Sequence, residues 1–348
     1  MNGTPPVKLL SVFFPMWNEE DYVERAIRAA EEECQRLVGL GEIADYELVI
    51  VDDCSTDRTP AIADGLAAAD PRIRVVDNPA GRTPHALNLG VAAARHSVVV
   101  RVDGHGELTD GYIARAVELL EETGAANVGG VMDAQGRSPF EQAVASAYTT
   151  RLGLGGSRFH LAGSPAGETE TVFLGVFRKE ALEAVGGFDE SMHRAQDWEL
   201  NYRLRADGRR VWFSPELRVT YRPRSSLRAL VRQMYETGKW RREVVRRHPE
   251  TASVRYLAPP VVAATIAAGT LAGVLGLLTG VDGLKAGWAA PLGYAGGVLA
   301  ASALEGRGLS WRARAWLPVV LGTVHLSWGT GFLFGSRPPQ GPGARGGR

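Results

Sequence analysis

Apolar and polar positions alternate in two distinct ways along the first two thirds of the chain. Four short apolar runs, rich in Val and Ile, have the length and composition of β-strands. Segments with the helical spacing of apolar residues separate them. The runs span residues 9–14, 46–51, 73–76 and 97–102, and the helical segments span residues 19–37, 60–69 and 84–95. Strands that alternate with helices predict an α/β fold with a parallel sheet across residues 8–230.

The last quarter of the chain has a different pattern. Three stretches contain no Asp, Glu, Lys or Arg, namely residues 257–280, 287–304 and 315–335. A helix needs about 20 residues to cross a hydrocarbon layer of about 30 Å, which the first and third stretches provide and the second barely provides. We therefore predict about three membrane helices within residues 256–335. The alternative is a set of buried helices in a soluble protein.

Arginines beside these stretches predict their orientation. They are Arg241, Arg242, Arg246, Arg247 and Arg255 before the first stretch, and Arg307, Arg312 and Arg314 before the third. Because Lys and Arg favour cytoplasmic loops, we expect a multi-pass protein of the cytoplasmic (inner) membrane. Residues 1–8 lack the layout of a signal peptide, so the N-terminal domain should face the cytoplasm. Three full spans would place the basic tail outside, which leaves a re-entrant segment as an alternative.

Charge is unevenly placed in a chain that has 39 basic and 39 acidic residues. This balance argues against a nucleic-acid partner. Residues 222–247 nevertheless contain nine Lys or Arg and two Glu, with aromatic residues among them. Such a segment directly before an apolar stretch predicts a basic interfacial helix over residues 226–255, lying on anionic lipid. The tail, residues 336–348, is rich in Gly, Pro and Arg and is predicted to be disordered.

Polar residues gather where the predicted strands end. These residues are Pro15-Met16-Trp17-Asn18-Glu19, Asp52-Asp53-Cys54-Ser55-Thr56-Asp57, Asp77-Asn78 and Asp103-Gly104-His105. Ligands of open parallel sheets bind at this edge, and a row of acids there suits a nucleotide and a divalent metal. The phosphate-loop string G-x-x-x-x-G-K-[ST] and the dinucleotide string G-x-G-x-x-G after the first strand are both absent.

Six motifs along the chain resemble, in order, those of family 2 inverting glycosyltransferases. The resemblance covers residues 8–225. It extends to the succinoglycan-type exopolysaccharide glycosyltransferases, which share the Val102-Asp103-Gly104-His105 variant, the Asn127-Val128-Gly129-Gly130 segment and a membrane region near His325-Leu326-Ser327-Trp328-Gly329. The six motifs are Phe14 to Glu19, Val51 to Asp57, Asn88-Leu89-Gly90, Val102 to His105, Gly186-Gly187-Phe188-Asp189-Glu190 and Gln196-Asp197-Trp198-Glu199.

This resemblance implies a GT-A fold, a Rossmann-like mixed sheet with flanking helices, that binds a UDP-sugar with Mg²⁺ or Mn²⁺. It implies that Pro15 lines the base pocket, that Glu19 and Asp53 hold ribose and uracil, and that Arg82 approaches the base or diphosphate. Asn18 and Asp52 belong to the same nucleotide-sugar site, although Asp52 could instead cap a turn.

The resemblance also assigns a metal motif. Asp103 opens the D-x-D motif, in which His105 replaces the second aspartate. Imidazole suits Mn²⁺ better than Mg²⁺, so the identity of the metal stays open. A structural histidine is the alternative for His105.

Asp197 matches the catalytic aspartate of the family. Inversion at a sugar carbon needs a carboxylate that accepts the proton of the attacking hydroxyl. Asp197 also begins a predicted helix over residues 197–205, so helix capping is the competing interpretation. The acceptor side should include Asp189, Glu199, Gln233, Lys239 and Trp240.

These observations predict an inverting hexosyltransferase that moves a sugar from a UDP-sugar to a lipid-linked acceptor of the undecaprenyl-pyrophosphate type. Its role would be exopolysaccharide or cell-envelope glycan synthesis. The predicted organisation is a GT-A domain at residues 1–225, with a nucleotide-binding half at 8–105 and an acceptor half at 106–225, followed by the interfacial and membrane helices. A processive polysaccharide synthase and a non-catalytic nucleotide-sugar-binding membrane scaffold are the alternatives.

Overall fold

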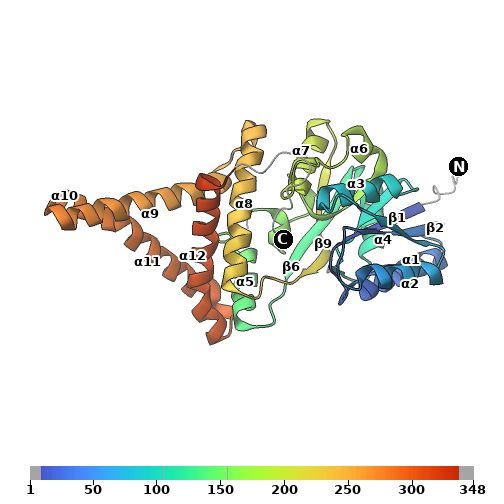
Figure 1. Ribbon diagram of the computed structural model, residues 1–348, viewed down its shortest axis with the longest axis horizontal. Helices are drawn as coiled ribbons and strands as arrows, with labels where there is room; N and C mark the ends of the chain where they lie inside the picture. The colour runs from blue at the N-terminus through green and yellow to red at the C-terminus, as the bar shows by residue number, and fades with distance from the viewer. Residues whose placement is uncertain (1–8, 105, 155, 337–348) are drawn as a thin grey trace. The chain divides into compact units, whose positions relative to one another are not determined.

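The computed structural model describes residues 9–104, 106–154 and 156–336. These residues form two compact units (Figure 1). The first unit contains residues 9–133 and 162–221, and the second contains residues 134–161 and 222–336. This division differs from a single domain over residues 1–225 because residues 134–161 belong to the second unit. The predicted tail, residues 337–348, lies outside the described residues.

A mixed sheet organises the first unit. Its strand order is β3-β2-β1-β4-β8-β6-β9-β5, and β7 also pairs with β9. The first four strands are β1 (Leu9–Met16), β2 (Asp45–Asp52), β3 (Ile73–Asp77) and β4 (Val98–Arg101). They are parallel to one another, as the apolar pattern predicts. Met16 pairs with Asp52 and Asp52 with Asp77, so the carboxyl ends of three strands lie in register.

The remaining strands extend this sheet in the antiparallel sense. They are β5 (Glu107–Leu108), β6 (Asn127–Ala134), β7 (Gly167–Glu168), β8 (Phe173–Arg178) and β9 (Val211–Tyr221). β8 pairs antiparallel with both β4 and β6, and β9 pairs antiparallel with β5 and β7. The mixed sheet implied by the resemblance is therefore present, whereas the apolar pattern by itself predicted only the parallel half.

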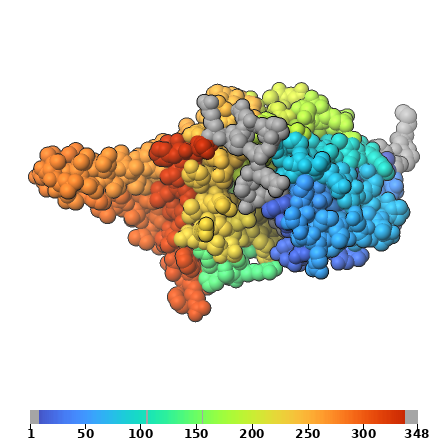
Figure 2. All heavy atoms as spheres, in the orientation of Figure 1, coloured from blue at the N-terminus to red at the C-terminus, as the bar shows by residue number. Residues whose placement is uncertain are grey.

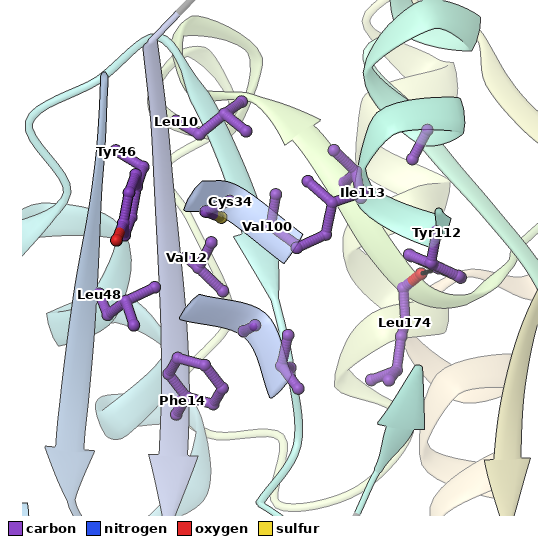
Figure 3. Packing of buried hydrophobic residues seen from close by; sticks show 14 of the residues in the cluster. Leu10, Val12, Phe14, Cys34, Tyr46, Leu48, Val100, Tyr112, Ile113 and Leu174 are labelled. Atoms are coloured by element: carbon purple, nitrogen blue, oxygen red, sulfur yellow. Dashed lines mark hydrogen bonds between the residues drawn. The ribbon is translucent and has the colours of Figure 1, made fainter. Parts of the chain in front are cut away.

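Helices pack on both faces of this sheet. They are α1 (Val23–Gly39), α2 (Thr59–Ala69), α3 (Thr83–Ala93), α4 (Tyr112–Thr123), α6 (Lys179–Ala184) and α7 (Gln196–Ala206). Leu10, Val12 and Phe14 of β1 meet Cys34 of α1 and Ile113 of α4 in one buried cluster (Figure 3). Burial of each large apolar side chain contributes about 1.5–3 kcal/mol.

Phe13 of β1 faces the opposite side of the sheet, toward α3. A Cβ atom at Gly90 would come within 2.3 Å of the Phe13 ring. Only glycine at position 90 therefore allows α3 to approach β1 this closely. This contact fixes the position of α3, which begins directly after Arg82.

The second unit is helical. Its longer helices are α5 (Pro139–Thr149), α8 (Leu227–Arg247), α9 (Val254–Thr279), α11 (Ala289–Glu305) and α12 (Trp311–Phe334). A short helix α10 (Asp282–Lys285) turns the chain between α9 and α11. Within the described residues, only α9 and α12 are long and apolar enough to cross a membrane, with mean hydropathy of 2.2 and 1.4. α11 has 17 residues and is too short, in line with the marginal length of the second apolar stretch.

Glycines set the contacts between these helices. A Cβ atom at Gly238 of α8 would lie 2.0 Å from the Trp328 carbonyl of α12, and one at Gly331 would lie 2.0 Å from the Tyr235 carbonyl. On α9, Gly273 packs against the Trp288 ring in the same way. The helix backbones thus approach closely, while the outer surface of α9, α10 and α11 carries large apolar side chains (orange in Figure 2).

Candidate functional site

The loops after β1 and β2 are joined at the carboxyl edge of the sheet. Asn18 and Cys54 both adopt left-handed backbone conformations, with φ of 54° and 58°. The Asn18 amide donates to Ser55 Oγ at 3.0 Å, and the Thr56 amide donates to Asn18 Oδ1 at 2.8 Å. Asn18, a predicted nucleotide-binding residue, therefore ties the two loops together.

The two aspartates after β2 have different surroundings. Asp52 accepts a hydrogen bond from the Ser55 amide at 3.2 Å, which is the turn-capping contact that competes with a binding role. Asp53 is 3% exposed and accepts a hydrogen bond from Asn78 Nδ2 at 2.6 Å. Asn78 Nδ2 also donates to the Arg82 carbonyl at 3.1 Å. Asn78, a strand-end residue without an assigned role, thus joins Asp53 to the Arg82 loop.

Glu19 lies beside the loop that follows β4. Its amide donates to Thr59 Oγ1 at 2.8 Å, and a Cβ atom at Gly104 would lie 3.0 Å from Glu19 Cγ. Pro15 sits one residue before the end of β1, paired with Val51. The structure therefore brings Pro15, Glu19, Asp53 and the Asp103 loop to one edge, whereas His105 lies outside the described residues.

Arg101, the last residue of β4, joins the two most important carboxylates of the site. Its side chain is 6% exposed, and Nε donates to Asp103 Oδ1 at 2.8 Å. Its Nη1 donates to Asp197 Oδ1 on α7. One buried cation therefore holds the predicted metal-binding and catalytic aspartates together, although they are far apart in the sequence.

Burial and the neighbouring charges shift the pKa values of Arg101 and Asp197. Burial lowers the pKa of Arg101, but Asp103 and Asp197 outweigh it and raise that pKa, so the guanidinium stays charged. Burial raises the pKa of Asp197, Arg101 opposes this change, and Asp103 adds to it, so the pKa of Asp197 lies above its ordinary value. The Asp197 side chain still has 44% of its surface exposed. Asp197 is therefore a reachable carboxylate with increased basicity.

Buried polar contacts fix helix α7, which carries Asp197. Asn201 accepts a hydrogen bond from Asn127 Nδ2 of β6 at 2.7 Å and donates to Thr171 Oγ1 at 2.9 Å. Asn127 and Asn201 are each 1% exposed. Two buried amides thus hold α7 against the sheet one turn after Asp197.

Glu199 also lies on α7, where it forms a buried ion pair. It is 3% exposed and binds Arg203 through both carboxylate oxygens at 2.7 Å. Arg203 also donates to the carbonyls of Val185 and Gly187. The predicted acceptor-side residue Glu199 therefore lies inside the unit, where it orients an arginine that braces the Gly186-Gly187 turn.

The Gly186–Glu190 loop is held by Asn88. Asn88 Oδ1 accepts from the Phe188 amide at 2.8 Å, and Nδ2 donates to the Phe188 carbonyl at 2.9 Å. Gly187 has φ of 70°, and a Cβ atom there would lie 2.6 Å from Asn88 Oδ1. Asp189 accepts from the amide and hydroxyl of Ser191 at 2.8 and 2.7 Å, which closes the turn.

The other predicted acceptor residues belong to the second unit, on α8. Gln233 Oε1 accepts from Tyr148 Oη at 3.0 Å. Lys239 pairs with Glu236 at 3.0 Å, and Trp240 is 4% exposed. The predicted acceptor set is thus divided between the two units, with Asp189 and Glu199 in the first.

Asp103 is the metal-binding candidate that the structure describes. Its side chain is 24% exposed. Among the described residues, one Asp103 oxygen binds Arg101 and the other has no hydrogen-bond partner. The described part of the chain contains no group of three or more His, Cys, Asp or Glu that could hold a metal. Within the described residues, Asp103 is thus the one predicted ligand at this edge, and a bound molecule could supply further oxygen ligands to a cation.

Sequence reasoning missed Arg101 and Asn201, and it placed Asn78 at a strand end without giving it a role. Arg101 was detectable as a cation at the end of an all-valine run, two residues before Asp103. Asn78 is marked only by its position after a predicted strand. Asn201 carries no such signal, because its role depends on contacts between distant elements.

Known proteins resemble this chain over most of its length. The model of the family described as glycosyl transferase family 2 matches residues 11–186. The succinoglycan biosynthesis protein ExoA of Rhizobium meliloti (strain 1021) is 34% identical over 92% of this chain and 93% of its own.

Two further similarities are more distant. The "Dolichyl N-acetyl-alpha-D-glucosaminyl phosphate 3-beta-D-2,3-diacetamido-2,3-dideoxy-beta-D-glucuronosyltransferase" of Methanococcus voltae is 23% identical over 67% of this chain and 72% of its own. A mannosyltransferase from Pyrobaculum calidifontis, solved in complex with GDP-Man and Mn²⁺, superposes with a TM-score of 0.59 at 18% identity, covering 93% of this chain and 87% of that protein. That structural similarity supports the fold. The family match and the 34% identity to ExoA over most of both chains show that this chain belongs to glycosyl transferase family 2.

Proposed function

We propose that this protein is an inverting glycosyltransferase that moves a sugar, a hexose, from a UDP-sugar to a lipid-linked acceptor at the cytoplasmic face of the inner membrane. The observation that carries this proposal is the Arg101 bridge between Asp103 and Asp197. The bridge supports this proposal because it joins Asp197, the candidate base, to Asp103, which follows β4 at the edge of the nucleotide-binding candidates. This is the arrangement that direct transfer between two bound substrates requires.

The donor would bind at the carboxyl edge of the parallel strands. Asp53, oriented by Asn78, is the candidate for hydrogen bonds to uracil, and Glu19 is the candidate for ribose. Pro15, Asn18 and Asp52 belong to the loops around this site. Arg82 is the candidate for contact with the base or the diphosphate. Arginine suits this position because its guanidinium can bind phosphate oxygens through two hydrogen bonds.

The residues fit a divalent cation that is shared with the donor. Mg²⁺ is usually held by one or two carboxylates together with substrate phosphates, and Asp103 offers one unengaged carboxylate oxygen. His105 is the second candidate ligand, and its nitrogen would favour Mn²⁺. When bound, the cation would offset the negative charge that develops on the departing diphosphate. The mannosyltransferase of similar fold was solved with Mn²⁺.

Asp197 would accept the proton of the acceptor hydroxyl as that hydroxyl attacks the sugar. Inversion requires the attack to come from the side opposite the leaving group, so one base suffices. The raised pKa of Asp197 strengthens the base, while Arg101 keeps it oriented. Asp189 and the loop held by Asn88 would form the acceptor side of the first unit, with Glu199 as a supporting residue. Gln233, Lys239 and Trp240 remain acceptor candidates in the second unit.

A membrane-bound acceptor is supported by the second unit and by the relatives. The helices α9 and α12 have the length and hydropathy of membrane spans, and α9 exposes Leu271 and Leu278 by 61% and 78%. One relative is named for succinoglycan biosynthesis, and another is named for a dolichyl-linked phosphate. An undecaprenyl-pyrophosphate oligosaccharide in exopolysaccharide or cell-envelope glycan synthesis fits both names.

The test is UDP release by the detergent-purified full chain. A panel of UDP-sugars is combined with a bacterial lipid extract and with Mn²⁺, Mg²⁺ or EDTA. We expect release with one donor, dependence on the metal, and a glycolipid product of inverted anomeric configuration by NMR. Asp103→Asn should raise the metal concentration needed for half-maximal rate, whereas Asp110→Asn, an exposed aspartate of the same region, should not. UDP-sugar binding without any release would contradict the proposal and favour a scaffold, and long polymer from one donor would favour a processive synthase.

A further inference from the structure

Helix α12 contacts polar parts of the second unit at its start and at its middle. At the start, Ser310 Oγ donates to Gln142 Oε1 of α5 at 3.4 Å. Near the middle, His325 Nε2 donates to the carbonyl of Leu152 at 2.5 Å. Leu152 lies in an irregular turn beside the exposed Arg151. Irregular backbone that faces lipid does not occur inside the hydrocarbon layer of a bilayer, so these surroundings do not suit the middle of a membrane span.

The last turns of α12 pack on α8, which is strongly charged. α8 contains seven Lys or Arg and two Glu. Arg242 of α8 donates to the carbonyls of Leu333 and Gly335, and Gly238 and Gly331 bring the two helix backbones into contact. Charged side chains are costly inside the hydrocarbon layer, so α8 belongs outside it. Because α12 runs beside α8 (Figure 1), α12 belongs at the same level.

Helices α9 and α11 meet α12 at opposite ends. A Cβ atom at Gly329 would lie 2.4 Å from the carbonyl oxygen of Pro259, near the start of α9. Arg314 Nη2 donates to the carbonyl of Ala303, near the end of α11, at 3.2 Å. Positions 314 and 329 differ by 15 residues, which is about 22 Å along a helix. α9 leads away from α12 to α10, and α11 returns (Figure 1), so α12 lies across the open end of this hairpin.

The hairpin has the length and the surface of a membrane-inserted element. α9 has 26 residues, so it is about 39 Å long and exceeds a hydrocarbon layer of about 30 Å. The returning residues 286–304 contain no charged residue and cover about 28 Å as a helix. At the tip, Asp282 and Lys285 form an exposed ion pair at 2.7 Å, which suits a headgroup layer. Leucines on the outer surface of the hairpin are at least 60% exposed, namely Leu271, Leu278, Leu292 and Leu299.

We propose that α9 and α11 cross the bilayer as a hairpin, whereas α12 lies along the membrane surface beside α8. The surface that enters the hydrocarbon of the lipid is then that of the hairpin alone. On its outer side α12 exposes Trp311 and Trp316 by 75% and 40%, and tryptophan is favoured at the boundary between membrane and water. The proposal goes beyond the proposed function and rests on it only for the location at a membrane.

This topology agrees with the charge of the sequence that follows α12. A hairpin keeps the residues before α9 and after α12 on one side of the membrane. The sequence after Gly335 contains three Arg and no Asp or Glu, and Lys and Arg favour the cytoplasmic side. Three full spans would instead place these arginines outside.

The experiment determines on which side of the membrane three exposed positions of the full chain lie. The variants are Gly283→Cys at the tip, Gly308→Cys between α11 and α12, and Ser336→Cys after α12. A Cβ atom meets nothing within 4 Å at Gly283 or Gly308, so neither change should disturb the fold. Each is made in a Cys54→Ser background, which serves as the control because the remaining Cys34 is buried. A membrane-impermeant maleimide is applied to spheroplasts of a Gram-negative host before and after permeabilisation.

We expect permeabilisation to increase the labelling of Gly308→Cys and Ser336→Cys at least tenfold and that of Gly283→Cys less than twofold. Labelling of Gly308→Cys in intact spheroplasts would mean that α12 crosses the membrane with α9. Labelling of Ser336→Cys in intact spheroplasts would mean three full spans. Either result would overturn the proposal, as would a Gly283→Cys variant that is labelled only after permeabilisation.

A pair of arginine substitutions provides an independent test. Val319, near the middle of α12, is 43% exposed, and Leu271, near the middle of the apolar part of α9, is 61% exposed. Leu271→Arg should reduce the protein retained in alkaline-extracted membranes severalfold, whereas Val319→Arg should change it less than twofold, because arginine is tolerated at the membrane surface. Equal losses would overturn the placement of α12.

Neither measurement depends on sugar transfer. A protein that shows this labelling pattern but transfers no sugar would reject the proposed function alone. An active enzyme whose Gly308→Cys variant is labelled in intact spheroplasts would reject the hairpin topology alone, so the two failures are distinguishable.

Discussion

Helices α1 and α9 bury opposite kinds of residue, although they are both long and well formed. The buried side chains of α1 are Val23, Ile27, Ala30, Cys34 and Leu37, and its outer face is charged. The buried residues of α9 include Pro260, Ala263, Gly273 and Gly276, whereas Val261, Leu271, Leu277 and Leu278 are more than 60% exposed. The first pattern is that of a helix in water. The second is that of a helix whose backbone packs closely on neighbours while its large apolar side chains face an apolar solvent.

The contrast between these two helices extends to the two units that contain them. The first unit buries polar groups that are hydrogen-bonded, such as Asn127 with Asn201 and Ser11 with Glu47, and it carries the candidate site carboxylates at one sheet edge. The second unit supplies an apolar surface and cationic residues at the ends of its helices. We infer that one unit performs the reaction and the other unit brings the enzyme to its lipid substrate.

The largest expected effect concerns Arg101 and the two carboxylates of the first unit that it binds. Arg101→Met should lower kcat about 1,000-fold, because it removes the group that orients both Asp103 and Asp197. Arg115→Met is the control, since Arg115 also pairs with several carboxylates but lies on the surface of α4. Steady-state transfer rates measure both variants. A wild-type rate for Arg101→Met would mean that the bridge has no part in the reaction.

The next effect tests whether the exposed surface of α9 faces lipid or water. Leu271→Arg should weaken membrane insertion by about 2.5–3.5 kcal/mol, the cost of an arginine near the middle of a span. Leu40→Arg is the control, because Leu40 in the first unit is also 61% exposed but should face water. Fractionation of membranes after alkaline extraction measures the retained protein. Equal retention of both variants would show that the surface of α9 faces water.

A smaller effect concerns the Gly186–Glu190 loop of the first unit. Gly186 and Gly187 both have positive φ, 79° and 70°, but only at Gly187 would a Cβ atom meet Asn88, at 2.6 Å. Gly186→Ala should therefore cost about 1 kcal/mol of unfolding free energy and Gly187→Ala about 2 kcal/mol. Urea unfolding measures both. Equal losses would mean that Asn88 does not hold the loop.

The smallest effect tests a buried charge of the first unit through pH. Burial raises the pKa of Glu47, but hydrogen bonds from the Arg95 amide, Ser11 and Arg74 outweigh it and lower that pKa below 4.5. A lowered pKa stabilises the fold above about pH 4.5, and this contribution is lost as the pH falls through the folded pKa. Glu47→Gln should therefore cost about 1 kcal/mol at pH 7 and less at pH 3.5. Urea unfolding at both pH values measures the change, and a loss that does not depend on pH would contradict it.

The sequence predicts the parallel half of the sheet well, because β1 to β4 are short segments that consist mostly of apolar residues. It predicts the antiparallel half poorly, since β6 contains two adjacent glycines and Ser214-Pro215-Glu216 interrupts the apolar pattern of β9. The division of the chain also escapes prediction, because the grouping of residues 134–161 with the second unit depends on contacts distant in sequence.

The candidate site shows the same limit. Aspartates after apolar runs indicate where the carboxylates gather, and the family motifs single out Asp197. No local pattern shows that Arg101 joins Asp103 to Asp197, because that contact connects β4 with a helix 96 residues later. The anchoring role of Glu199 is equally hidden, since a glutamate on a short polar helix appears exposed until its arginine partner is known.

The most direct test of the account is the Asp197→Asn variant, with kcat and UDP affinity measured on the same preparation. Asparagine keeps the size and the hydrogen bond to Arg101 but cannot accept the proton. The account predicts that kcat falls about 1,000-fold or more while UDP affinity changes less than about twofold. A rate close to wild type, or the loss of UDP binding in a folded variant, would contradict the assignment of Asp197 as the base.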